Sequence, residues 1–165
     1  MSHLPSVAVV GLGSMGLGMA RSLVRAGLAV RGFDISADAL NALEAAGGTP
    51  GANPGDAVAG ADVAVIVVVN AAQTETVLFG ENGVVAAMKP GGVIIACATI
   101  SPAEAKRFAA RVEEAGLLYV DGPISGGSKK AEAGQLTFMA SGSAAAFAAA
   151  RSALDAMAGT VYELG

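Results

Sequence analysis

The stretch VAVVGLGSMGLGMARSL, residues 7–23, decides the fold of this 165-residue chain. Residues 7–10 form a short apolar run that is typical of a buried strand and stops at Gly11. Residues 14–26 place apolar side chains on one face at helical spacing, which predicts an amphipathic helix. The segment GLGSMG therefore joins a predicted strand directly to a predicted helix.

A GxGxxG pattern is weak support for a nucleotide site when it stands alone, but this one has the strand and helix that the chemistry requires. Gly11 allows the tight turn, Gly13 lets the backbone approach a pyrophosphate, and Gly16 lets helix and strand pack closely. The amides at the helix start then face the phosphates. We expect the cofactor to contact the whole turn: Gly11, Leu12, Gly13, Ser14, Met15 and Gly16.

An acidic residue, Asp34, ends the second predicted strand, residues 28–33, and follows Gly16 by 18 positions. A carboxylate at this place accepts hydrogen bonds from the ribose hydroxyls of the adenosine and repels a 2′-phosphate. The sequence therefore predicts NAD as cofactor, with NADP disfavoured.

The rest of the chain alternates between strand-like and helix-like segments. Residues 63–69 are apolar throughout, as in a strand covered by helices on both faces. This alternation predicts an α/β fold of the Rossmann type, in which residues 1–165 form one doubly wound, mostly parallel sheet with helices on both faces. Further strands are expected at 92–96, 117–120, 135–141 and 160–162, and helices at 37–46, 53–59, 73–79, 84–88, 102–115, 128–133 and 144–157, with a loop at 121–127.

Charge and composition exclude several classes of partner. The net charge is -4, with no basic face of the kind that nucleic-acid binding needs. The longest nearly apolar run, residues 60–69, is too short to cross a membrane and contains Asp62. Cys97 is the single cysteine, which excludes an internal disulfide and any multi-cysteine metal site. With no signal peptide visible, we expect a cytoplasmic protein that binds no nucleic acid, membrane or metal.

Other polar candidates have simpler interpretations. His3 lies at the N-terminus, where a catalytic role is not expected, and Cys97 ends an apolar strand as a small buried side chain. Lys129 and Lys130 fit a solvated helix face better than a substrate site. Asp121 begins the loop at 121–127 and is expected to fix its shape rather than to carry protons.

Three stretches together resemble the β-hydroxyacid dehydrogenase family, which includes 3-hydroxyisobutyrate, tartronate semialdehyde and L-threonate dehydrogenases and is related to 6-phosphogluconate dehydrogenase. They are the opening stretch at 7–23, ATISPAEA at 98–105 and DGPISGGSKKAEAGQLTFMASG at 121–142. The resemblance implies that Ser125, Gly126 and Gly127 hold the substrate's carboxylate. It also implies that the cofactor contacts four further residues: Val68, Val69, Gln73 and Thr99. The chain departs from the family at Val68-Val69, often Leu-Pro, and at Ala96, often Asp.

The resemblance further implies a second, mainly helical domain beyond Gly165, with the lysine that acts as general acid and base. No catalytic residue is therefore expected in this chain, which should bind NAD without turning over a substrate. The full-length form should be a homo-oligomer that oxidises a small hydroxy acid. An L-threonate-like substrate comes first, with 3-hydroxyisobutyrate or tartronate semialdehyde close behind.

Two other functions stay open at this point. The chain could be a non-catalytic NAD(P)-binding module or sensor. It could also be another enzyme with a Rossmann fold, such as a methyltransferase that uses S-adenosylmethionine.

Overall fold

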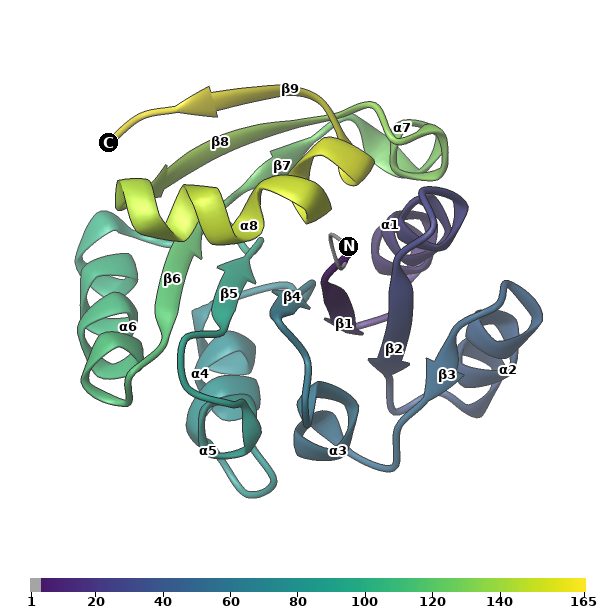
Figure 1. The fold of residues 1–165 in the computed structure, drawn as a ribbon, viewed down its shortest axis with the longest axis horizontal. Helices are drawn as coiled ribbons and strands as arrows, with labels where there is room; N and C mark the ends of the chain where they lie inside the picture. Colours follow the sequence, from purple (N-terminus) through teal and green to yellow (C-terminus); the bar gives the residue numbers. More distant parts are fainter. Residues whose placement is uncertain (1–3) are drawn as a thin grey trace.

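The computed structural model describes residues 4–165, so His3 lies outside the described part. One sheet runs through the molecule in the order β3-β2-β1-β4-β5-β6-β8-β7, and β9 pairs with β8 (Figure 1). The strands are β1 (Ser6–Val10), β2 (Ala29–Phe33), β3 (Thr49–Pro50), β4 (Val63–Ile66), β5 (Val93–Ala96), β6 (Leu118–Asp121), β7 (Ile124–Ser125), β8 (Leu136–Gly142) and β9 (Ala158–Glu163). From β3 to β6 every pairing is parallel, in the strand order of a Rossmann domain, which confirms the predicted fold class.

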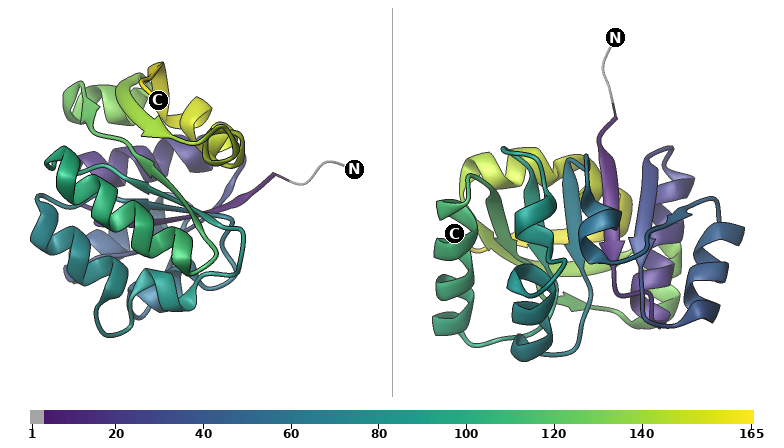
Figure 2. Two further views of the ribbon diagram at one scale, coloured as in Figure 1. Left: turned by 90° about the vertical axis from the view of Figure 1, so that its left-hand side faces the viewer. Right: turned by 90° about the horizontal axis from the view of Figure 1, so that it is seen from below.

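Helices cover both faces of the sheet (Figure 2). They are α1 (Ser14–Arg25), α2 (Ala37–Ala45), α3 (Pro54–Val58), α4 (Ala71–Phe79), α5 (Val84–Ala87), α6 (Pro102–Glu114), α7 (Gly127–Ala133) and α8 (Ala144–Met157). Alternate residues of β1 enter different cores: Val7 and Val9 pack with α1 and α8, whereas Ala8 and Val10 pack with α4 and α6. Within residues 4–165, no helix has the length and apolar character needed to cross a bilayer.

The structure differs from the predicted elements mainly beyond β6. The predicted loop at 121–127 contains β7, which pairs antiparallel with β8, and the last strand spans Ala158–Glu163 rather than 160–162. The strand predicted at 63–69 ends at Ile66, because Asn70 caps α4 and turns the chain away from the sheet. The two-residue strand β3 was not predicted, since so short a pairing leaves no periodic pattern.

Helix α7 packs directly against α1, and small residues make this possible (Figure 1). A Cβ on Gly18 of α1 would lie 2.9 Å from the backbone nitrogen of Glu132. One turn further along α1, the buried hydroxyl of Ser22 donates to the carbonyl of Ala131 at 2.7 Å. Arg21 forms an ion pair with Glu132 at 3.0 Å at the edge of the contact. The two helices are therefore fixed to one another by shape and by hydrogen bonds.

Substituting Gly18→Ala should lower the free energy of unfolding by about 1–3 kcal/mol, the usual cost of overpacking. Helix propensity alone would make the alanine variant more stable by about 1 kcal/mol. A decrease in the free energy of unfolding would therefore report the contact with α7 and not helix propensity. Urea denaturation of the unliganded chain measures the effect. Gly13→Ala is the control, because its Cβ would meet no atom within 4 Å and should cost less. A Gly18→Ala variant as stable as the parent would mean that α7 moves freely away from α1.

Candidate functional site

The loops that follow the parallel strands lie side by side at one edge of the sheet. Hydrogen bonds continue the strand ladder into them: Gly11 N donates to Phe33 O at 2.9 Å, and Val67 N to Val10 O at 2.8 Å. Cys97 N donates to Ile66 O at 3.0 Å. The turn after β1, Asp34 after β2, the loop after β4 and Thr99 after β5 are thus brought to the carboxyl edge, where ligands of this fold class bind.

The GLGSMG turn depends on two close backbone contacts. Gly11 has φ of +98°, and a Cβ there would lie 2.1 Å from the carbonyl oxygen of Val67. A Cβ on Gly16 would lie 1.8 Å from the carbonyl oxygen of Gly11, so α1 packs as closely as a glycine allows. Gly13 is different, since its missing Cβ faces open space. Two glycines therefore shape the turn, and the third leaves room for a ligand to approach the backbone.

Helix α1 starts without a capping side chain. Its N-cap is Gly13, and among the described residues no side chain accepts a bond from its first amides. Five other helices are capped, by Ser36, Asn53, Asn70, Ser101 and Ser143. The first amides of a helix need acceptors, and the helix dipole adds positive potential there. The start of α1 therefore suits an anionic acceptor such as a pyrophosphate.

Asp34 is bonded into the same turn. One carboxylate oxygen, Oδ2, accepts from Leu12 N at 2.7 Å, and Oδ1 accepts from Ser36 N at 2.8 Å. Each oxygen keeps further acceptor capacity, so the carboxylate is oriented and still able to receive ribose hydroxyls. The next side chain, Ile35, is 96% exposed, and sequence reasoning passed over it. The sequence feature that could have pointed to Ile35 is its position as an apolar residue directly after the acidic Asp34.

The loop after β4 is also held by a side chain. Gln73 accepts a hydrogen bond from Val69 N through Oε1 at 2.9 Å, so it fixes this loop as well as lying beside it. Val69 is 80% exposed, whereas Val68 is half-buried. Thr99 is exposed beyond β5. Two exposed apolar side chains, Ile35 and Val69, thus stand near the glycine turn.

The predicted substrate loop lies at the start of α7. Ser125 is exposed and pairs with Thr137 in the β7–β8 ladder. Gly126 and Gly127 have φ of +136° and +79°, a backbone course that favours glycine and leaves both residues exposed. Helix α7, into which this loop leads, packs on α1, and α1 begins at the glycine turn. The position of the loop is therefore tied to that of the glycine turn.

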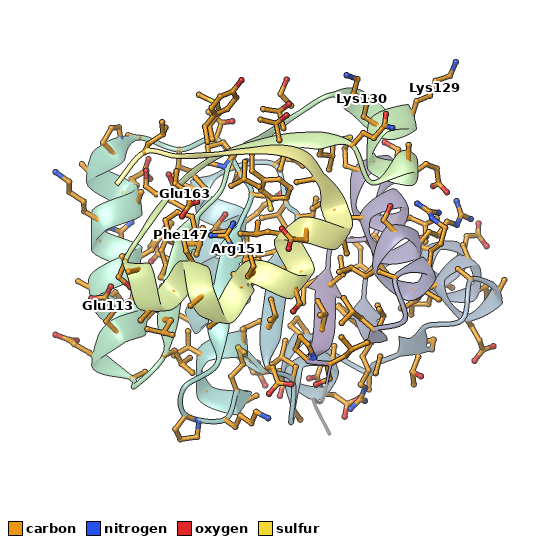
Figure 3. All side chains as sticks on the ribbon, turned by 45° about the horizontal axis from the view of Figure 1, so that its top comes forward. Glu113, Lys129, Lys130, Phe147, Arg151 and Glu163 are labelled. Carbon is orange, nitrogen blue, oxygen red and sulfur yellow. The ribbon has the colours of Figure 1, made fainter. Side chains whose placement is uncertain are left out.

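The other polar residues that the sequence analysis considered are not assigned to the site. Lys129 and Lys130 are exposed and point outward from α7, in agreement with a solvated helix face (Figure 3). Cys97 is buried as predicted, and burial, with Asp121 nearby, raises the pKa of its thiol to about 12. No cluster of three or more His, Cys, Asp and Glu able to hold a metal occurs among residues 4–165.

The side chain of Asp121 is half-buried at the end of β6. Its Oδ1 atom is buried, and no group in the described chain donates a hydrogen bond to it. Burial also raises the pKa of this carboxyl group. The expectation that Asp121 shapes the 121–127 loop rather than carrying protons stays a prediction.

Comparisons with known proteins match this geometry. L-threonate dehydrogenase of Cupriavidus necator is 47% identical over 97% of this chain, which covers 54% of that protein. NAD-dependent L-serine dehydrogenase of Pseudomonas aeruginosa is 36% identical over 98% of the chain, again 54% of that protein. The crystal structure of 3-hydroxyisobutyrate dehydrogenase from Salmonella typhimurium superposes with a TM-score of 0.94 at 44% identity, over 98% of this chain and 56% of that one.

The chain thus spans about half the length of the relatives it matches. The predicted resemblance to hydroxyacid dehydrogenases is confirmed by the names of these relatives. The family model for the NAD-binding domain of 6-phosphogluconate dehydrogenase matches residues 6–165, nearly the whole chain. The chain belongs to this family of NAD-binding domains. The expectation of NAD as cofactor agrees with this family and with the Pseudomonas aeruginosa relative, which is named as NAD-dependent.

Proposed function

We propose that this chain is the cofactor-binding half of an NAD-dependent dehydrogenase that acts on a small hydroxy acid, with L-threonate as the first candidate. One observation carries the proposal: the uncapped start of α1 and the carboxylate of Asp34 are held in the same turn, by the 2.7 Å bond from Leu12 N. In this proposal an anion site at the start of α1 lies next to an acceptor for ribose hydroxyls, and the bond from Leu12 N to Asp34 supports it. The relatives named for dehydrogenases of small hydroxy acids support the reaction class.

In this proposal the protein binds and orients the cofactor. The amides of Ser14 and Met15, close to Gly13, would hold the pyrophosphate, and Asp34 would accept hydrogen bonds from the ribose hydroxyls. Ile35 and Val69 offer apolar surface to the adenine side of the site. When bound, NAD accepts a hydride from the carbon that carries the substrate hydroxyl. Thr99, at the end of β5, lies on the nicotinamide side.

The substrate carboxylate is assigned to Ser125, Gly126 and Gly127. A small carboxylate needs several donors that converge on it, and a serine hydroxyl followed by two exposed glycine amides supplies them. Nothing in this chain is assigned to move the hydroxyl proton. We assign that step to the lysine of a second, mainly helical domain of the full-length enzyme, as the family resemblance implies. We also propose, on the same resemblance, that the full-length enzyme is a homo-oligomer.

Substituting Asp34→Ala should raise the dissociation constant for NADH by about tenfold to a hundredfold, because hydrogen bonds to a charged group are lost. Binding of NADPH should change less, so the preference for NADH should narrow. The chain has no Trp, so NADH fluorescence can be followed without tryptophan emission. Asp38→Ala, an exposed acid in the first turn of α2, is the matched control. An unchanged NADH-to-NADPH ratio would remove Asp34 as the selector.

The 165-residue chain alone should bind NADH and show no turnover with L-threonate, 3-hydroxyisobutyrate or L-serine. Extending it after Gly165 with the residues that follow the matched region in the Cupriavidus necator enzyme should restore oxidation of L-threonate, measured as NADH formation. Robust turnover by the chain alone would contradict the proposed division of labour. A larger thermal stabilisation by S-adenosylmethionine than by NADH would contradict the proposal as a whole.

In the extended chain, Ser125→Ala should raise KM for L-threonate by about tenfold, the loss of one hydrogen bond to a charged group, with a smaller effect on kcat. Steady-state kinetics at saturating NAD measure both constants. Ser128→Ala, three residues further along and also exposed, is the control. If Ser125→Ala left KM and kcat as they were, the hydroxyl would not touch the substrate.

A further inference from the structure

A groove of about 350 Å³ lies on the α6 face of the sheet, away from the glycine turn. Its walls come from α6, β6 and the end of β8, and Gly165, which follows β9, also lines it. Figure 1 shows the end of the chain on the side of the molecule that α6 covers. The cofactor site proposed above uses none of these wall residues, so the groove needs an explanation of its own.

Two buried polar atoms in this groove lack partners. Tyr119 and Asp121 stand two residues apart on β6, so both side chains lie on the α6 face of the sheet. Tyr119 is 4% exposed, and its hydroxyl forms no hydrogen bond within residues 4–165. The Oδ1 atom of Asp121 is likewise buried without a donor in that range. Buried groups of this kind cost stability and usually mark a missing partner.

The protonation states of Tyr119 and Asp121 define which hydrogen-bonding groups an occupant of the groove must have. Burial, with the charge of Asp121 adding to it, raises the pKa of Tyr119, which keeps the phenol protonated as a donor and acceptor. Burial also raises the pKa of Asp121, because no N–H or O–H compensates its desolvation. An occupant must therefore bring N–H donors for a carboxylate and a carbonyl for a phenol. The backbone of a polypeptide offers both.

Charge and chain direction favour a peptide over a free metabolite. Lys106 and Glu113, both on α6, put opposite charges on the walls, which does not select a strongly charged ligand (Figure 3 labels Glu113). Leu164 N donates to Ala140 O at 2.7 Å, so the ladder between β9 and β8 runs on to the edge of the groove. The matched relatives are nearly twice as long as the matched region, since it covers 54% of the Cupriavidus necator protein.

We propose that this groove receives the polypeptide segment that follows the NAD-binding domain in these relatives, with Asp121 and Tyr119 as hydrogen-bond partners for its backbone. The groove is also lined by Ile100 and Pro102, which follow Thr99 closely along the chain and lie beyond the carboxyl end of β5. The segment is therefore led toward the carboxyl edge of the sheet, where the nicotinamide side was assigned. The inference needs the family membership and does not depend on which hydroxy acid is the substrate.

The test compares two substitutions in two chains. In the 165-residue chain, Tyr119→Phe and Asp121→Asn should leave the thermal midpoint unchanged or raise it by about 2–4 °C, because each removes or softens an unsatisfied buried group. In the chain extended after Gly165 with the Cupriavidus necator residues, the same substitutions should lower the midpoint by a similar amount. Tyr162→Phe, on an exposed tyrosine of β9, should have no effect in either chain.

Equal losses in both chains would overturn the proposal, because the two groups would then be satisfied inside this domain. So would the absence of any loss in the extended chain. If the extended chain does not fold, a synthetic peptide of the first residues after the matched region replaces it. That peptide should shift the amide resonances of Tyr119, Asp121 and Ser141 in the 165-residue chain, and less so in a Tyr119→Phe, Asp121→Asn double variant.

Absence of these shifts would also overturn the proposal. An unidentified small molecule that co-purifies with the 165-residue chain, and produces the same shifts on its own, would assign the groove to a diffusible ligand instead. None of these readouts uses catalysis. A failure of the docking proposal is therefore separate from a failure of the NADH-binding experiments.

Discussion

The close contact between Gly16 and the carbonyl group of Gly11 is the constraint on which the rest of the structure depends. A Cβ at Gly16 would lie 1.8 Å from that oxygen, so any other residue would force α1 away from β1. Gly11 is held in turn by Phe33 O and by its fit against Val67 O, so the contact joins three strands to one helix. Because α7 packs against α1, a shift of α1 would move both halves of the proposed site.

The open space beside Gly13 explains why the start of α1 stays uncapped. A side-chain cap at the position of Gly13 would fill the space that its missing Cβ leaves open. The fold accepts amides without an internal partner at this helix, whereas α2, α4 and α6 are capped by Ser36, Asn70 and Ser101. An uncapped start lowers the stability of the free protein and raises its affinity for an anion. Binding of NAD and folding stability are therefore coupled at this turn.

Local patterns in the sequence predicted the fold and the cofactor turn, since both depend on residues close together along the chain. The alternation of elements and the spacing from Gly16 to Asp34 are of this kind. Two features were not predicted from the sequence. The antiparallel contact of β7 with β8 depends on strand register, and the bond from Val69 N to Gln73, only four residues apart, depends on side-chain geometry. The proposed substrate role of Ser125 came from the family resemblance alone. The unpartnered oxygen of Asp121 became visible only with the packing of α6 over β6.

The contact of α1 with α7 joins the two halves of the proposed site into one mechanical unit. The cofactor's phosphates would bind at the start of α1, and the substrate's carboxylate at the loop that leads into α7. Gly18 and Ser22 lock these helices through backbone proximity and a buried hydrogen bond. The separation between cofactor and carboxylate is thus set within this domain, before any second domain arrives. In the proposed enzyme, what a second domain then has to add is the proton-transfer group and the exclusion of water.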